Sequence, residues 1–207
     1  MDMIILDPGD QSDIIEERQD FGVDRFDEVW EGVYVVSPLP NDEHQEIVGT
    51  LTICFGIVIQ LTKLGKVRPG VNVSDRVDGW DQNYRGPDVV VFMNDTKARN
   101  YGAHWVGGPD FAVEVVSRYD RSREKLDFYS KIATGELLIV DRYPWALELY
   151  RLSVARTLDL IGRSTLDQPD ILTSQVLPLS FQLHVEANDE RPRILVSHLE
   201  DARTWLV

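Results

Sequence analysis

Apolar residues along the middle of the chain follow first a helical and then a strand-like pattern. Between residues 42 and 62 they recur every three or four positions, which predicts an amphipathic helix. Three strand-like runs follow at residues 66–73, 89–93 and 111–116. The last two are almost continuously apolar, as is typical of strands that are buried on both faces of a sheet. The middle of the chain is therefore predicted to form a helix followed by three strands.

Further elements are predicted on both sides of this region. A second helical pattern covers residues 121–133, and a hairpin turn is indicated at Glu31-Gly32. Other strand-like pieces lie at residues 29–36, 137–140, 146–150, 157–161 and 180–185. Because helices are interspersed with buried strands, we expect an α/β fold. Its mixed central sheet would be flanked by helices, with additional β-hairpins at the N- and C-terminal ends.

The beginning of the chain lacks this periodicity and is strongly acidic. Up to Glu31 there are eleven acidic residues against two arginines, a net charge of −9 out of −14 for all 207 residues. We therefore expect an acidic N-terminal arm over residues 1–25 that is mobile or loosely docked. The chain length and the apolar content of 43% suit a single domain over residues 26–207.

No segment resembles a targeting signal or a membrane span. The N-terminus carries acids rather than a basic segment before an apolar core, and the apolar run at residues 53–59 is far shorter than the roughly 20 residues of a membrane helix. Cys54 is the only cysteine, so an internal disulfide is excluded, and its place in that run favours a core thiol over a nucleophile. We expect a soluble cytoplasmic protein without a membrane partner.

The charge balance bears on nucleic-acid binding in two ways. A net charge of −14 argues against a general affinity for nucleic acid, because Lys and Arg dominate phosphate binding. The segment 118–131 is basic, however, because it contains three acidic residues and five basic ones: Arg118, Arg121, Arg123, Lys125 and Lys131. An acidic chain can therefore still present a locally basic face.

Two carboxylates are candidates for chemistry because of their surroundings. Asp88 directly precedes the apolar run at 89–93, and Glu114 interrupts the run at 111–116. A buried carboxylate costs several kcal/mol unless a cation or hydrogen-bond donors compensate it. A divalent cation shared by Asp88 and Glu114 would do so. A structural ion pair of Glu114 with Arg or Lys, or a water-exposed strand edge, explains the pattern equally well.

Lys125 lies on the apolar face of the second predicted helix. It precedes Tyr129 by four residues and Ile132 by seven, so the three side chains share one side of the helix. Because this helix follows the strand of Glu114, Lys125 is placed to reach the carboxylates. The alternative is a lysine whose stem lies along the apolar surface while its ammonium reaches water.

An ordered series of segments resembles the Uma-two family of restriction-endonuclease-like proteins. The segments are 83–92 (NYRGPDVVVF), 109–117 (PDFAVEVVS), 123–129 (REKLDFY) and 136–141 (ELLIVD), preceded by 30–38 (WEGVYVVSP) and 44–48 (HQEIV). The resemblance covers about residues 28–183. It implies the fold of the PD-(D/E)XK nucleases, in which an Asp and a Glu hold Mg²⁺ or Mn²⁺ and a Lys assists attack on phosphodiester bonds.

By this resemblance Asp88 and Glu114 are the metal ligands, joined by the backbone carbonyl of Val115. The superfamily lysine usually stands two residues after the Glu, which is Val116 here, and Lys125 matches the lysine that replaces it in this family. His44 and Glu46 match the place of an accessory acid or orienting group in some relatives, although a capping or surface role is the alternative for each.

The function implied by the resemblance is metal-dependent hydrolysis of nucleic acid, and DNA is the expected substrate. Arg118, Arg121 and Arg123 are candidates for phosphate contacts, with solvated helix charges as the alternative. Cutting of a duplex usually requires two active sites, so the superfamily also implies a homodimer. The displaced lysine and the negative net charge of the chain support a different hypothesis, in which the chain is a non-catalytic DNA-binding or assembly module that retains the nuclease fold.

Overall fold

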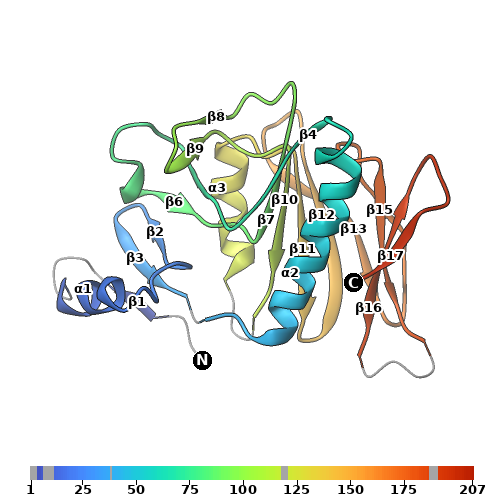
Figure 1. Ribbon diagram of the computed structural model, residues 1–207, viewed down its shortest axis with the longest axis horizontal. Helices are drawn as coiled ribbons and strands as arrows, with labels where there is room; N and C mark the ends of the chain where they lie inside the picture. The colour runs from blue at the N-terminus through green and yellow to red at the C-terminus, as the bar shows by residue number, and fades with distance from the viewer. Residues whose placement is uncertain (1–3, 7–11, 38, 118–120, 187–190) are drawn as a thin grey trace.

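The computed structural model describes residues 4–6, 12–37, 39–117, 121–186 and 191–207, and over these the strands form three sheets (Figure 1). The central six-stranded sheet contains β4 (Gly65–Pro69), β7 (Val89–Met93), β10 (Phe111–Val115), β11 (Glu136–Arg142), β12 (Trp145–Leu152) and β13 (Leu158–Thr165). Only β10 and β11 are parallel among its neighbouring pairs, in the order β13-β12-β11-β10-β7-β4. The predicted mixed central sheet is confirmed.

Two helices cover opposite faces of this sheet (Figure 1). On one face α2 (Asp42–Phe55) packs Ile47, Leu51 and Phe55 into a core shared with the strands. On the other face, α3 (Leu126–Lys131) contributes Phe128 and Tyr129. Because both faces are covered, the central strands are buried on both sides, which explains their continuous apolar runs.

The other two sheets flank the central one. The N-terminal side carries seven strands: β1 (Ile4–Leu6), β2 (Glu28–Trp30), β3 (Val33–Val36), β5 (Asn72–Ser74), β6 (Tyr84–Arg85), β8 (Arg99–Asn100) and β9 (His104–Val106). The C-terminal sheet contains β14 (Leu172–Thr173), β15 (Leu179–His184), β16 (Arg193–His198) and β17 (Thr204–Leu206). Phe181 and Val196 of this sheet pack into the α2 core.

The hairpin turn at Glu31-Gly32 is confirmed. It joins β2 and β3, and both turn residues have positive φ values, 48° for Glu31 and 86° for Gly32. Positive φ at both central positions matches the twist of the flanking strands, and glycine adopts it without steric cost. The turn brings β2 alongside β6, so that Val29 pairs with Tyr84.

Several element boundaries differ from the sequence-based expectations. Residues 66–73 form two strands in different sheets, because the chain crosses between the sheets after β4 ends at Pro69.

The first predicted helix ends in a π-helical turn, Gly56–Gln60, and its N-cap is Asn41, whose side chain accepts a hydrogen bond from the His44 backbone N–H. The second predicted helix is shorter than expected, with a 3₁₀ turn at Ser122–Lys125 before α3. A further 3₁₀ turn spans Trp80–Gln82.

Both edges of the central sheet are irregular. At one edge, β4 ends in Pro69, exposes Lys66, and uses the backbone N–H of Val67 to donate to Gln60 Oε1 at 3.2 Å. At the other edge, a bulge in β13 leaves Ile161 without a partner residue on β12. These features interrupt the regular hydrogen-bonding rows of the edge strands.

The acidic arm contains regular structure that the sequence pattern does not predict. β1 pairs with β3, and α1 (Ser12–Asp20) carries Arg18, which donates to both oxygens of buried Asp27 at 2.7 and 2.9 Å. Asp27 also accepts from the Tyr34 hydroxyl at 2.8 Å. The arm is therefore joined to the β2–β3 hairpin by an ion pair. Over the described ranges, no helix is long and apolar enough to cross a membrane.

Deletion of residues 1–20 is expected to lower the free energy of unfolding by about 1.5–3 kcal/mol, because charge-assisted hydrogen bonds to buried Asp27 are lost. It also removes seven acidic residues and one arginine, so DNA binding at low salt should strengthen. Urea unfolding and fluorescence anisotropy with a labelled duplex measure the two effects. Arg18→Met in the full chain should reproduce the stability loss alone, and an unchanged unfolding curve for both proteins would contradict the ion pair's role.

Candidate functional site

The two candidate carboxylates lie where the antiparallel strands β7 and β10 meet. Val89 at the start of β7 is opposite Val113. Asp88 directly precedes β7 and lies outside this pairing, whereas Glu114 follows Val113 on β10. Strand pairing therefore brings the beginning of β7 beside the part of β10 that carries Glu114.

Asp88 is held between β10 and the beginning of α2. Its Oδ2 accepts a hydrogen bond from the backbone N–H of Val115 at 2.7 Å. Its Oδ1 lies 3.3 Å from Nε2 of His44, which is buried in the first turn of α2. The Asp88 side chain keeps 15% of its surface exposed. The carboxylate is thus fixed by two neighbours while remaining partly open to solvent.

Glu114 is deeply buried and has the cationic partner that such a carboxylate requires. The Nζ atom of Lys125 lies 3.1 Å from each oxygen of Glu114. The Tyr129 hydroxyl donates to Oε1 of the same carboxylate. Burial, and next the negative charge of Glu114, raise the pKa of Tyr129 well above its ordinary value, so the phenol stays protonated and donates. The predicted contact between Lys125 and Glu114 is present.

Lys125 also contacts a carboxylate that the sequence analysis does not single out. Its Nζ lies 2.9 Å from Oε1 of Glu28, the first residue of β2. The same oxygen accepts from the backbone N–H of Gly86 at 2.9 Å, and Oε2 accepts from Nε1 of Trp30 at 2.6 Å. Glu28 and Lys125 are 97 residues apart, and β2 is three residues long. The one local signal is an acid directly before the apolar Val29-Trp30 pair, which many exposed hairpins share.

Asp88 and Glu114 are of the chemical type that a hard divalent cation prefers as ligands. Asp88 and Glu114 provide carboxylate oxygens, which Mg²⁺ and Mn²⁺ prefer, and Mg²⁺ is commonly bound by one or two carboxylates together with substrate phosphate and water. Within the described residues, no group of three or more His, Cys, Asp or Glu side chains is placed to hold a metal ion. The donor set therefore suits Mg²⁺ or Mn²⁺ completed by water and substrate, rather than a closed zinc site. Sharing of one cation by the two acids stays a prediction.

Of the two predicted accessory residues, the structure places one at the site. His44 contacts Asp88, and its buried Nδ1 atom has no hydrogen-bond partner among the residues that the structure describes. Glu46 instead pairs with Arg191 at 2.6 Å and Arg193 at 2.9 Å, and the hydrogen bond from Arg191 is the main reason that the pKa of Glu46 is lowered. The surface alternative therefore describes Glu46 better than an accessory role.

The predicted phosphate-binding arginines are engaged in ion pairs. Arg121 pairs with Glu124 at 2.8 Å. Arg123 lies 3.0 Å from Glu148 and 2.9 Å from Asp141, and its pKa is raised, mainly by the hydrogen bond to Glu148. Arg118 lies outside the described residues. A phosphate contact by any of the three stays a prediction, and for Arg121 and Arg123 it requires competition with these carboxylates.

Cys54 points into the α2 core and is fully buried. Burial raises the pKa of its thiol to about 11, so the sulfur is protonated at neutral pH. This environment agrees with the expectation of a core thiol.

The mixed sheet, with an acid directly before β7, a buried acid on β10 and a lysine before α3, defines a restriction-endonuclease-like protein. The chain belongs to the Uma2 family, whose model, described as "Putative restriction endonuclease", matches residues 16–186. The crystal structure of a "putative nuclease belonging to DUF820" from Anabaena variabilis ATCC 29413 is similar, with a TM-score of 0.55 and 17% identity over 72% of this chain and 80% of that chain. The comparison with curated proteins gives no match. The expected family and fold class are confirmed.

Proposed function

We propose that this chain is a metal-dependent nuclease that hydrolyses phosphodiester bonds of DNA. The observation that carries the proposal is the contact of Lys125 with buried Glu114 on β10, the strand whose Val115 N–H donates to Asp88. Family membership supports the same reaction class. We further propose that the protein acts in the cytoplasm. We also propose that it forms a homodimer, because cleavage of both strands of a duplex needs two active sites.

Asp88 and Glu114, with the backbone carbonyl of Val115, would hold Mg²⁺ or Mn²⁺. When bound, such an ion lowers the pKa of a water molecule and neutralises charge on the phosphate. The N–H of Val115 and the imidazole of His44 orient Asp88, and the hydroxyl of Tyr129 orients Glu114. These contacts fix both acids before a ligand arrives, which lowers the reorganisation needed for binding.

Lys125 would stabilise negative charge that develops on the phosphate in the transition state. Val116 cannot do this, because its side chain lies in the apolar core and carries no charge. The 3₁₀ turn before α3 brings the ammonium of Lys125 back to Glu114 from the next element. Lys125 thus reaches Glu114 from the turn before α3, rather than from position 116 at the end of the Glu114 strand.

A supercoiled-plasmid assay tests the proposal. The wild-type protein is expected to nick the plasmid with Mn²⁺ and to stop when EDTA is added. Asp88→Asn, purified in the same way, should nick at least about tenfold more slowly, since a metal ligand is weakened. Equal rates for the two proteins would identify the activity as a contaminating nuclease.

A non-catalytic DNA-binding module is the second candidate, and it is favoured by the two carboxylates that hold Lys125. This function requires DNA binding without metal binding. Calorimetry with Mn²⁺ separates the two functions, because a nuclease of this class must bind the ion. DNA binding without Mn²⁺ binding or nicking would replace the nuclease proposal with the module.

A further inference from the structure

A pocket beside the N-terminal sheet gathers positive charge, although the chain as a whole has a net charge of −14. Its volume is about 460 Å³, which lies within the range of small-molecule sites, and its lining includes Lys97, Arg99, Tyr101 and Lys131. Arg99 belongs to β8, and Lys131 is the last residue of α3. Figure 1 shows β8 and β9 at the top of the view and α1 of the acidic arm near its lower left.

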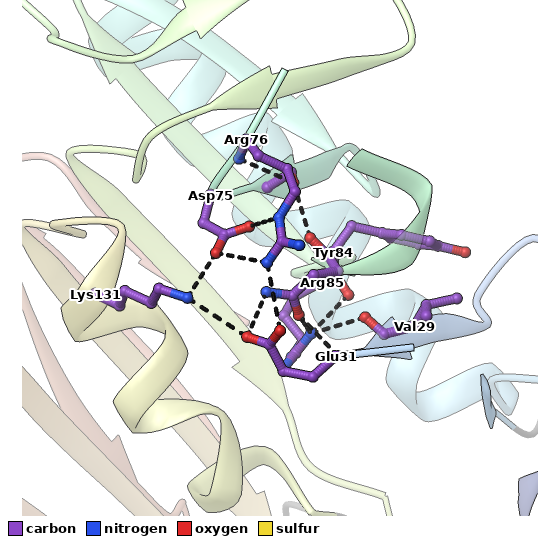
Figure 2. A network of polar contacts seen from close by, with 9 residues as sticks. Val29, Glu31, Asp75, Arg76, Tyr84, Arg85 and Lys131 are labelled. Atoms are coloured by element: carbon purple, nitrogen blue, oxygen red, sulfur yellow. Dashed lines mark hydrogen bonds and ion pairs between the residues drawn. The ribbon is translucent and has the colours of Figure 1, made fainter. Parts of the chain in front are cut away.

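Six charged side chains line or border the pocket: the cations Lys97, Arg99, Lys131 and Arg76, and the carboxylates Asp75 and Glu31. Four positive and two negative groups give a formal charge of +2. Both carboxylates pair with Lys131 and Arg76, and the contact between Lys131 and Asp75 is 2.7 Å long (Figure 2). Within the part of the chain that the structure describes, the exposed side chains of Lys97 and Arg99 have no ion-pair partner. These two cations are therefore available to an anionic ligand.

An aromatic stack stands beside these cations. The ring of Tyr101 stacks on that of buried His104, with centroids 5.6 Å apart and 13° between the planes, and Trp80 stacks on the same imidazole at 4.6 Å. Neither ring nitrogen of His104 has a hydrogen-bond partner among the described residues, so the imidazole contributes to this stack as a flat ring. His104 thus supports the ring of Tyr101, which lines the pocket and is 46% exposed.

The pocket and the carboxylate site lie at opposite ends of the same short helix. Lys125, which contacts Glu114, is the N-cap of α3, and Lys131 at the pocket is its last residue. Six residues of α-helix span about 9 Å. The pocket is therefore separate from the carboxylates, yet close enough for one DNA strand to contact both.

We propose that this pocket binds an unpaired nucleotide of a DNA strand, with the base stacked on Tyr101 and the phosphate held by Arg99 and Lys97. The inference rests on the proposed action on DNA and adds which feature of the substrate the protein selects. Stacking on an aromatic side chain requires a base with a free face, and it accepts all four bases. Bases inside a duplex are covered on both faces by their neighbours. A single-stranded or frayed segment therefore fits the pocket, whereas an intact duplex does not.

Fluorescence anisotropy in the presence of EDTA measures DNA binding without cleavage. The probes are a labelled single-stranded oligodeoxynucleotide and the blunt duplex of the same sequence, at low salt. The single strand should bind at least about tenfold more tightly than the duplex. Tyr101→Ser should weaken single-strand binding by about 5- to 150-fold, the usual effect of losing one base–aromatic stack. Tyr101→Phe keeps the ring and should bind like wild type.

The salt dependence of binding tests the two cations. Arg99→Met and Lys97→Met should each reduce the slope of log affinity against log salt concentration by about 0.7, because one phosphate contact is lost. Arg203→Met is the matched control, a partly exposed arginine directly before β17, and should leave the slope unchanged. Urea unfolding of each variant checks that it is folded.

Equal affinities for the single strand and the duplex, or unchanged binding by Tyr101→Ser, would overturn this inference and leave the metal-dependent function standing. Tight binding of the single strand that depends on Tyr101, in a protein that does not nick plasmid with Mn²⁺, would support the inference and overturn the nuclease proposal. Deoxyadenosine monophosphate is the competitor. If it binds as tightly as the strand, the pocket is a site for free nucleotides and the assignment to DNA is wrong.

Discussion

Lys125→Met is expected to lower the rate of Mn²⁺-dependent plasmid nicking by about 10²- to 10³-fold, the usual cost of losing one electrostatic contact to a transition state. Methionine keeps the aliphatic stem of the side chain and removes its charge. The measurement compares wild type, Lys125→Met and Glu114→Ala at matched concentrations of folded protein. Nicking that survives Lys125→Met but not Glu114→Ala would show a metal-dependent enzyme that does not need this lysine.

The effect of Lys125→Met on folding stability has to be measured separately from its effect on nicking. From the sequence alone, the substitution is expected to change stability little. The structure corrects this expectation, because Glu28 and Glu114 would remain buried without their shared cation. Removing one partner of a buried ion pair typically costs about 3–5 kcal/mol. Lys125→Met with Glu28→Gln, which removes one of the two carboxylates, should recover part of this loss in thermal melting while nicking stays low.

Arg151→Met is expected to destabilise the whole protein by about 3–5 kcal/mol, because it leaves Glu136 as an unpaired buried charge. Glu136 is fully buried on β11 and lies 2.7 Å from Nε of Arg151. It also accepts from the hydroxyl of Ser174 and from the backbone N–H of Gln175, in the connection between β14 and β15. This network joins the central sheet to the C-terminal sheet.

Urea unfolding followed by tryptophan fluorescence measures the effect of Arg151→Met. Arg99→Met, a substitution of an exposed arginine on β8, is the matched control and should change stability by less than about 0.5 kcal/mol. A single transition shifted as a whole would support the expected single domain over residues 26–207. Two separate transitions, or equal stabilities of the two variants, would show that the Glu136 network does not join the sheets.

The candidate site was predictable where its signal is local. Asp88 is marked by the apolar run that it precedes, Glu114 by the run that it interrupts, and Lys125 by its place on an apolar helix face. Each signal depends on a window of a few residues and on the period of one element. Strand order then brings these elements together, because β10 pairs with β7 and the chain turns into α3 shortly after β10 ends.

The parts that were missed depend on contacts between distant segments. Glu28 belongs to a strand too short to show a buried face, and its partner Lys125 is 97 residues away. The helix α1 has a predominantly polar sequence and is joined to the fold by the Arg18–Asp27 ion pair. The division of residues 66–73 between two sheets likewise depends on tertiary contacts. Pro69-Gly70 indicates a break in the strand but does not indicate which sheet the following residues join.

The irregular edges of the central sheet have a consequence for self-association. A regular edge strand offers free N–H and C=O groups to another chain and is a common starting point for aggregation. Here Gln60 already uses the N–H of Val67 on β4, Pro69 has no N–H to offer, and the bulge at Ile161 distorts β13. Strand addition is therefore disfavoured at both edges of this sheet, and a second copy would have to associate through helices, loops or the flanking sheets instead.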